Sequence, residues 1–459
     1  MAASVSGSPA ASTPIAAEPV VIRPAPSAPV AASGAAEAGV IESPAAEPAE
    51  SPVGTPGDGE AASVSADVLH APTMALPLIS SRAAIEPGMD LPLPDSEAGP
   101  DARDRLPTLD LAGSGLGSLV EAIEFAAGTQ FTTTPRPWAS VRVLLVTGSR
   151  TGGAAAGDDP ADVERRIAEV ESGTGLLSRL AGEAGADVAV LRTAPAGPIE
   201  DGPAMDDAAV EAALRQGWQL ADAAADAGRD LLVLASIGVG TDAIATAVTA
   251  ATTGAEPVAV LPRVLAPGGT FDDAAWMVRC AAVRDALHRI RQESRGAKDI
   301  LRELGGADLA VATGALLGAA ARRLPVLLDG PLGIAAGLVA RDVASQTRHW
   351  CLLTDAGGLE LVSQGADVLG LSPVLTLGLG LGEGANALAT LPLLRTAIGL
   401  AAAAPVHPAL LADHDDDGLT DLLTPDANPT ADDDPEQTRE DLDFAEPSPE
   451  GPGPATSRG

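Results

Sequence analysis

Short apolar runs alternate with longer segments of helical periodicity between residues 105 and 411. An apolar run bounded by turn residues predicts a buried strand, and apolar residues that recur every three or four positions predict a helix. The predicted strands are 142–146, 187–191, 230–235, 257–261, 325–328, 350–353 and 373–377. The predicted helices are 161–184, 206–227, 241–252, 272–292, 332–343 and 387–404, with one more ending at 323 and one entered from the glycine-rich segment 111–127.

This alternation of strands and helices predicts the fold class. Parallel strands need long crossover connections, which are usually helices that cover the sheet. We therefore expect a three-layer α/β fold, with a mostly parallel, Rossmann-like sheet, helices on both faces and a small helical lobe. Asp272 is expected to cap the helix that follows it.

Glycine-rich loops follow several of the predicted strands. In open parallel sheets, ligands bind beyond the carboxyl ends of the strands. We therefore expect these loops to surround a ligand site at one edge of the sheet. The loops are 148–153, 236–240, 305–306, 329–330 and 378–384.

The stretch Leu377–Thr390, LGLGLGEGANALAT, places a single carboxylate, Glu383, among glycines and ahead of an apolar helix. Glycine neighbours let other backbone or a ligand approach closely. In an apolar setting, desolvation would raise the pKa of this carboxylate and make it a better proton acceptor. The alternative is a solvent-facing acid in a glycine-rich turn, and the spacing alone does not separate the two.

The segment 238–243, GVGTDA, follows a predicted strand and opens a predicted helix. Backbone N–H groups at such a helix start can hold a phosphate, which makes Gly238 and Gly240 candidate binding residues. A single glycine motif supports dinucleotide binding only weakly, and GSRTGG at 148–153 lacks the Lys-Ser/Thr pair of a triphosphate-binding loop. Because other glycine loops share this edge, phosphate binding of another kind is the favoured interpretation.

The two ends of the chain differ in composition from the middle. Residues 1–104 are rich in Ala, Pro, Ser and Glu, and residues 412–459 are rich in Asp, Glu and Pro. Neither end has the apolar content that offsets the entropy of ordering, so we expect two disordered tails around one domain, 105–411. The net charge of −35, most of it in the tails, argues against nucleic acid or a membrane as a partner.

Cysteine and histidine usage gives no sign of a metal site. Cys280 and Cys351 lie in apolar surroundings and form neither a disulfide framework nor a CxxC motif. No two of the five histidines have metal-ligand spacing. The N-terminus has no basic segment followed by an apolar one, and Pro392 and Arg395 interrupt the apolar segment 387–404. We expect a cytoplasmic protein without a bound metal.

Two motifs carry a family resemblance. Residues 305–330 read GGADLAVATGALLGAAARRLPVLLDG, and residues 381–387 read LGEGANA. Together they resemble the GG-[AF]-DL…P-[VL]-LLDG and RLGEG-x-[GA]-A motifs of nicotinate-nucleotide–dimethylbenzimidazole phosphoribosyltransferases. The segment 271–284, FDDAAWMVRCAAVR, is similar to a further family segment. The resemblance extends over about 111–404, which is nearly all of the expected domain.

The resemblance implies an enzyme, a pentosyltransferase, that moves phosphoribosyl from nicotinate mononucleotide to 5,6-dimethylbenzimidazole or a similar base. The products would be α-ribazole 5′-phosphate and nicotinate, for the lower ligand of cobalamin. Glu383 falls on the family's catalytic base, and Arg279 falls on a lysine that contacts phosphate. No cofactor is implied, the partners would be these small molecules, and we expect a homodimer. The expected substrate-binding residues are Gly238, Gly240, Arg279, Gly305, Gly306, Gly382 and Gly384.

Several substrate loops depart from the family pattern. Ser149-Arg150-Thr151 stands where the family has Asp-His-Gly, Ser236 where it has an acid, and Thr241-Asp242-Ala243 where it has Asn-Thr-Thr. These changes favour an alternative, a non-catalytic homologue that binds a nucleotide or base or pairs with an active subunit. The retained Glu383 favours the enzyme. The sequence does not say which base would be accepted.

Overall fold

The computed structural model describes residues 20–23, 84–113, 115–292, 296–382 and 384–412. The chain divides into two compact units, 1–407 and 408–459. In the second unit, the structure describes the short helix α14 (Pro408–Ala412). All other elements belong to the first unit.

A six-stranded sheet forms the middle layer, with the strand order β1-β3-β2-β4-β7-β8. Strand β1 pairs antiparallel with β3, and the other pairs are parallel. The strands are β1 (Val21–Arg23), β2 (Val141–Gly148), β3 (Asp187–Arg192), β4 (Leu231–Gly238), β7 (Val326–Leu328) and β8 (Cys351–Leu353). A separate hairpin joins β5 (Leu265–Ala266) to β6 (Thr270–Phe271). Because β3 and β4 lie on opposite sides of β2, the sheet has its topological switch point between β2 and β4.

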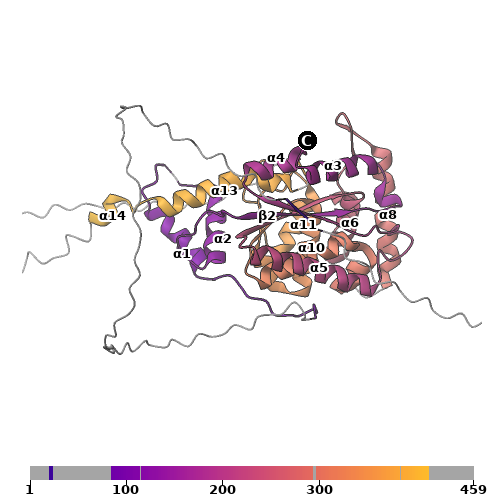
Figure 1. Cartoon of the computed structure of the whole chain (residues 1–459), viewed down its shortest axis with the longest axis horizontal. Helices are drawn as coiled ribbons and strands as arrows, with labels where there is room; N and C mark the ends of the chain where they lie inside the picture. Colours follow the sequence, from indigo (N-terminus) through magenta and orange to yellow (C-terminus); the bar gives the residue numbers. More distant parts are fainter. Residues whose placement is uncertain (1–19, 24–83, 114, 293–295, 383, 413–459) are drawn as a thin grey trace, which may run out of the picture. The chain divides into compact units, whose positions relative to one another are not determined.

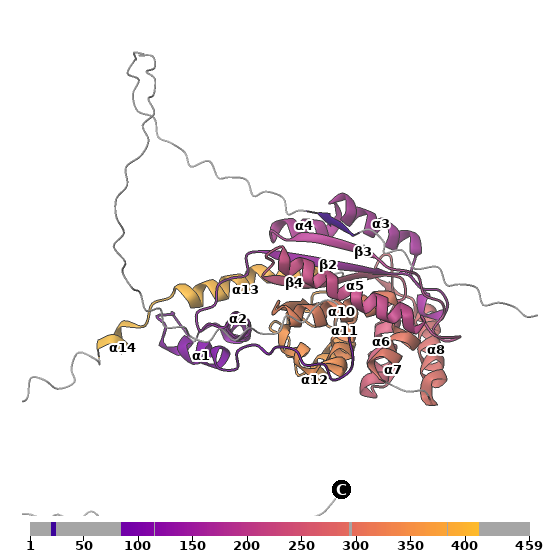
Figure 2. The same cartoon turned by 60° about the horizontal axis from the view of Figure 1, so that its bottom comes forward.

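Helices cover both faces of the sheet, and Figure 2 shows α3 and α4 on one side of β2, β3 and β4 and α5, α10 and α11 on the other. The first apolar cluster of the core includes helices α5 (Asp207–Asp226), α6 (Thr241–Thr253), α8 (Asp273–Arg289), α10 (Ala307–Ala321), α11 (Gly330–Val343) and α12 (Glu360–Leu369). The second includes α2 (Val120–Gln130), α3 (Pro160–Ser172), α4 (Gly175–Glu183) and α13 (Ala385–Ala403).

The alternation of side chains in β2 explains the two clusters. Leu144 and Val146 belong to the first cluster, whereas Val143 and Leu145 belong to the second. Successive residues of a strand point to opposite faces, so a run of apolar residues lets both faces be covered. The predicted three-layer α/β fold is therefore confirmed.

The remaining helical segments are short. They are α1 (Ala98–Arg105), α7 (Pro257–Val260), α9 (Ala297–Ile300), a π-helical turn at Leu301–Gly305, and 3₁₀ turns at Leu106–Thr108, Gly117–Leu119, Gly153–Ala155, Ile290–Gln292 and Ser345–Trp350. Figure 1 shows α1, α2 and α13 gathered beside the sheet. Asp272 caps α8 by accepting the N–H of Ala275 at 2.9 Å, as predicted.

Three predicted elements were wrong in type or length. The predicted strand at 257–261 is helix α7, because Pro257 takes the first helical position, where proline is favoured. The predicted helix at 161–184 is two helices, α3 and α4, separated where Gly173 adopts a left-handed conformation with φ of +79°. The predicted strand at 373–377 makes one isolated bridge, between Leu375 and Asp355.

The predicted start of the domain at residue 105 is also too late. Helix α1 crosses that boundary, and Ala98 and Ala102 are buried. The Trp350 Nε1 atom donates to the carbonyl oxygen of Pro92 at 2.7 Å. Residues from 84 onward therefore contribute to the fold, as does strand β1. The rest of the two predicted tails lies outside the described residues.

Helix α13 is the one helix of the described chain that is long and apolar enough to cross a membrane by length and composition. In its most apolar window, 56% is buried within the fold. Leu388, Leu391, Leu394 and Ile398 belong to the core cluster that contains α2, α3 and α4. Helix α13 thus has the burial of a core helix.

Helices α5 and α10 pack with their backbones in close approach, and glycines make this possible. A Cβ atom on Gly217 would overlap the carbonyl oxygen of Val311, and one on Gly314 would overlap the carbonyl oxygen of Leu214. Larger residues at these positions would force the two helices apart. The first apolar cluster therefore depends on these glycines.

We predict that Gly217→Ala and Gly314→Ala each destabilise the protein, because overpacking typically costs about 1–3 kcal/mol. Gly399→Ala in α13 is the matched control, since its nearest new neighbour would be Pro137 Cγ at 3.5 Å. The control should gain roughly 0.5–1 kcal/mol from the lower entropy cost of alanine in a helix. Urea unfolding would measure all three. Equal effects at the three positions would contradict the tight α5–α10 packing.

Candidate active site

The glycine-rich loops meet at the carboxyl edge of the parallel strands. Strands β2 and β4 run in register to their last pair, Gly148 with Gly238. A Cβ atom on Gly238 would lie 2.7 Å from the carbonyl oxygen of Gly148, so the two strand ends touch. This is the switch point of the sheet, where α/β proteins bind ligands. The candidate site therefore surrounds these two strand ends.

Asp355 follows β8 and organises the loop that leads toward Glu383. It is 2% exposed. Its carboxylate accepts backbone N–H groups from Leu377 at 2.5 Å, Gly378 at 3.0 Å and Leu379 at 3.2 Å. One buried carboxylate therefore holds three consecutive residues of the loop to the end of β8.

Asp329 follows β7 and holds the start of α13. Its carboxylate accepts the side-chain N–H of Asn386 at 2.9 Å and the backbone N–H of Ala387 at 3.0 Å. The Asn386 side-chain oxygen in turn accepts the N–H of Leu381 at 3.0 Å. Burial raises the pKa of Asp329 to about 6, against these hydrogen bonds, which lower it. Asp329 and Asn386 thus connect β7, the glycine loop and α13.

Glu383 itself lies outside the described residues, so its predicted role remains a prediction. Its two neighbours are described, Gly382 with φ of +66° and Gly384 with φ of +85°. The Ala385 N–H donates to the carbonyl oxygen of Gly382 at 2.7 Å. A Cβ atom on Gly384 would lie 2.5 Å from Cβ of Ala235 in β4. Gly384, the last residue of the LGEG motif, therefore lies against the strand that ends at Gly238.

Arg279, on α8, is buried near the start of α6 and is 2% exposed. Its Nη2 atom donates to Asp158 Oδ1 at 2.6 Å, and its Nε atom donates to the carbonyl oxygen of Ala156 at 2.7 Å. The other oxygen of the Asp158 carboxylate accepts the N–H of Gly240 at 2.7 Å. Asp158 therefore occupies two of the groups that were expected to bind phosphate, the N–H of Gly240 and the guanidinium of Arg279. Its negative charge lies at the position that was expected for the phosphate.

Gly305 and Gly306 are held to the end of β2 by Arg150. The Nη2 atom of Arg150 donates to the carbonyl oxygen of Gly305 at 2.8 Å and forms a buried ion pair with Asp308. A Cβ atom on Gly148 would overlap the Asp308 carboxylate, so this position requires glycine. Arg150 at the family's histidine position is thus a partner of the loop before α10.

The structure brings all seven described substrate-binding candidates to this edge of the sheet. Sequence reasoning missed four residues that organise it, Asp158, Asp329, Asp355 and Asn386. Two of them carried a usable signal, because Asp329 directly follows a buried strand and Asp355 follows one after a single threonine. Asp158 carried none, because its partners Gly240 and Arg279 lie 82 and 121 positions away.

The described residues contain no group of three or more His, Cys, Asp and Glu side chains that could hold a metal ion. Cys280 and Cys351 are free thiols. Burial raises the pKa of Cys351 to about 12, which keeps it protonated and unreactive at neutral pH. These thiols contribute no nucleophile to the site.

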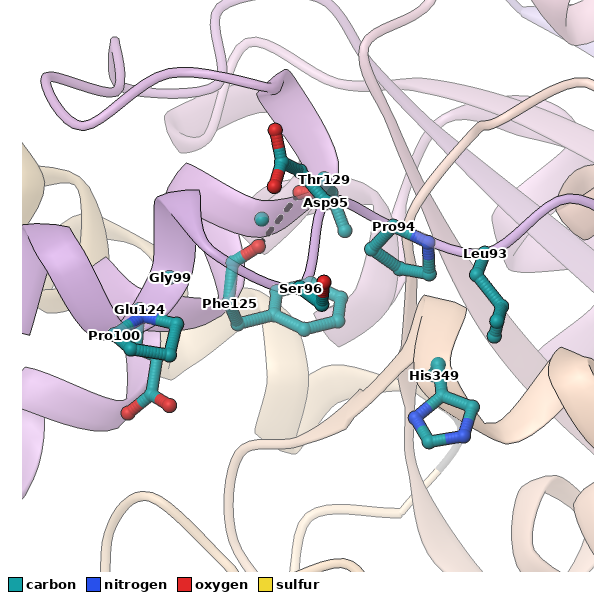
Figure 3. A pocket seen from close by; sticks show the side chains of 11 residues that line it. Leu93, Pro94, Asp95, Ser96, Gly99, Pro100, Glu124, Phe125, Thr129 and His349 are labelled. Carbon is teal, nitrogen blue, oxygen red and sulfur yellow. Dashed lines mark hydrogen bonds between the residues drawn. The ribbon is translucent and has the colours of Figure 1, made fainter.

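A separate pocket of about 350 Å³ lies beside α1 and α2 (Figure 3). His349, which lines it, lies two residues before the start of β8, so the pocket is at the amino end of that strand. The Asp95 carboxylate in its wall accepts the N–H groups of Glu97 and Ala98 at 2.9 and 3.1 Å. The glycine loops follow the opposite, carboxyl ends of the strands. This pocket is therefore not part of the candidate site.

Comparison with known proteins places this chain in a family. The profile of a family described as phosphoribosyltransferase matches residues 91–406. A nicotinate-nucleotide–dimethylbenzimidazole phosphoribosyltransferase of Mycobacterium bovis (strain BCG / Pasteur 1173P2) is 33% identical over 358 residues, which cover 73% of this chain and 98% of that protein. The enzyme of the same name from Streptomyces avermitilis is 41% identical over 207 residues, 45% of this chain and 54% of that protein.

Solved structures give the same result. The crystal structure of the enzyme of this name from Thermus thermophilus superposes with a TM-score of 0.61 at 25% sequence identity. The superposition covers 68% of this chain and 97% of the Thermus chain. A second structure from the same organism has a TM-score of 0.60 at 26% identity. The resemblance seen in the sequence motifs is confirmed. The chain therefore belongs to the nicotinate-nucleotide–dimethylbenzimidazole phosphoribosyltransferase family, a family of pentosyltransferase enzymes.

Proposed function

We propose that this protein transfers phosphoribosyl from nicotinate mononucleotide to 5,6-dimethylbenzimidazole or a similar base. The products are α-ribazole 5′-phosphate and nicotinate, and the step belongs to synthesis of the lower ligand of cobalamin. Family membership supports the general reaction. The observation that carries the proposal is the buried network of Asp355, Asp329 and Asn386, which holds the residues on both sides of Glu383 at the switch point.

In the proposed reaction, Glu383 takes the ring N–H proton of the base. The ring nitrogen so activated attacks C1′ of the ribose, and the C1′–N bond to nicotinate breaks from the opposite side. The bonding electrons return to the pyridinium nitrogen, so nicotinate leaves with a neutral ring. The glycines on both sides of Glu383 give a flat base room to approach the carboxylate.

The phosphate of the nucleotide would bind near Gly240 and Arg279, where Asp158 now lies. A phosphate and a carboxylate repel each other strongly at short range. The phosphate must therefore displace the Asp158 carboxylate from these donors. We propose that this displacement is part of substrate binding.

The alternative is a homologue that binds a nucleotide or base without catalysis. The occupied Arg279 and the buried Arg150–Asp308 pair favour it, since both use cations internally. A homodimer remains a prediction under either proposal. The release of nicotinate by the purified protein decides between the two.

Glu383→Gln keeps the size of the side chain but cannot accept a proton. We predict a fall in kcat of about 10²–10⁴, the usual value of general-base catalysis, with nucleotide binding retained. Nicotinate release from nicotinate mononucleotide and dimethylbenzimidazole measures it, and Glu360→Gln, at an exposed position of α12, is the control. If Glu383→Gln is as fast as the wild type, Glu383 is not the base. If wild type binds the nucleotide but releases no nicotinate, the non-catalytic alternative holds.

Asp158→Asn should strengthen binding of nicotinate mononucleotide about tenfold or more, because it removes a negative charge from the position of the phosphate. The corresponding nucleoside, which lacks the phosphate, should bind wild type and variant alike. Isothermal titration calorimetry would measure both ligands, with circular dichroism to verify folding. Weaker nucleotide binding by the variant would argue that Asp158 assists the phosphate site instead of blocking it.

The raised pKa of Asp329 makes stability depend on pH. The pKa of Asp329 is about 6 in the folded protein, above the reference value of 3.8. Protonation of Asp329 therefore stabilises the folded state. This stabilisation is fully present below pH 3.8 and is lost as the pH rises through about 6. Lowering the pH from 7 to 4.5 should favour wild type over Asp329→Asn by about 2 kcal/mol. Urea unfolding of both proteins at the two pH values tests it. A stability difference that does not change with pH would contradict the buried, protonatable Asp329.

A further inference from the structure

Strand β1 covers an edge of the sheet that the rest of the fold leaves open. Without it β3 would be the edge strand, with a row of unpaired N–H and C=O groups that can pair with another chain. Val21 pairs with Val190, Ile22 with Ala189 and Arg23 with Val188, in antiparallel register (Figure 2, dark blue arrow beside β3). Residues 24–83 separate this short strand from the next described segment.

Side chains fix the position of β1 at its two ends. At one end, Val20 is half-buried and packs against the first apolar cluster of the core. At the other end, Arg23 Nη1 donates to the carbonyl oxygen of Glu171 at 2.6 Å, at the C-terminal end of α3. A cation is favoured at this end of a helix, where backbone carbonyls lack partners. Between the two anchors, Val21 and Ile22 remain largely exposed.

Gly173 leaves the space that binds the guanidinium of Arg23. It ends α3 in a left-handed conformation, and a Cβ atom there would overlap the guanidinium carbon of Arg23. The missing side chain therefore leaves the space that the guanidinium fills. Backbone pairing along β3 and the guanidinium site beside Gly173 together recognise an extended segment with an arginine at a defined position. Peptides that add a strand to a sheet are recognised in this way, by main-chain hydrogen bonds and side-chain pockets.

We propose that the edge of β3 and the end of α3 form a recognition site for an extended peptide with an arginine at the last of its paired positions, and that residues 20–23 are its ligand within the same chain. Because residues 20–23 belong to the same chain as the site, their docking is intramolecular, which gives an effective concentration on the order of millimolar or somewhat below. A segment of only four residues can therefore stay docked while its intrinsic affinity is weak. This site lies on the edge of β3 that faces away from β2, whereas the candidate active site lies at the ends of β2 and β4, so it does not rest on the proposed function.

Hydrogen exchange in the full-length chain tests the docking. Ile22→Pro removes a backbone N–H and Arg23→Ala removes the guanidinium. Both should accelerate exchange of amides within 187–192 about tenfold or more, and Arg136→Ala, at an exposed arginine elsewhere, should not. Unchanged exchange in Ile22→Pro would overturn the proposal. Protection that rises with wild-type concentration would overturn the assignment to the same chain, because docking between copies depends on concentration.

A labelled synthetic peptide of residues 18–25, EPVVIRPA, tests the site itself. Fluorescence anisotropy should show that it binds full-length Ile22→Pro at least tenfold more tightly than wild type, whose site is already filled. The same peptide with alanine in place of its arginine should bind Ile22→Pro several-fold more weakly. Equal binding of the peptide to wild type and Ile22→Pro, or no binding to either, would overturn the proposal.

Discussion

Two buried carboxylates, Asp329 and Asp355, hold the loop on which the candidate site depends. Each follows a parallel strand at the carboxyl edge, and each accepts backbone or amide N–H groups from 377–387. A buried carboxylate without such donors would be costly, and loop N–H groups without acceptors would be costly as well. The N–H groups of the loop and the carboxylates at the strand ends therefore satisfy each other's hydrogen-bonding needs. This places Gly384 against β4 without a further regular strand.

The same edge shows how charge is distributed around the switch point. Arg279, which was expected to bind phosphate, and Arg150, which stands at the family's histidine position, are both buried and paired with Asp158 and Asp308. An unpaired buried guanidinium would be strongly destabilising, so the fold supplies carboxylates from within the chain. Of these, Asp158 is the one bound to the helix start, where a phosphate is favoured. Substrate binding and internal charge balance are thus linked at Asp158.

The type and the length of individual elements were the features least predictable from the sequence. A short apolar run such as 257–261 has the same composition in a strand and in a buried helical turn, and Pro257 decided between them through its fixed φ. Gly173 divides the predicted helix at 161–184 into two, and its lack of a side chain leaves space for the guanidinium of Arg23. These features depend on contacts with segments far away in the chain, which a local pattern does not contain.

The sequence by itself determined the layers, the parallel sheet, the glycine loops and the family motifs, because each is written in neighbouring residues whose period or spacing has a direct physical meaning. It also supplied Glu383 as the candidate base. Only the tertiary structure decided which charges meet. Asp158 reaches Gly240 and Arg279, and Asn386 reaches Asp329, because strands distant in sequence end side by side. Pairing across such distances depends on the packing of whole elements, and no residue spacing reveals it.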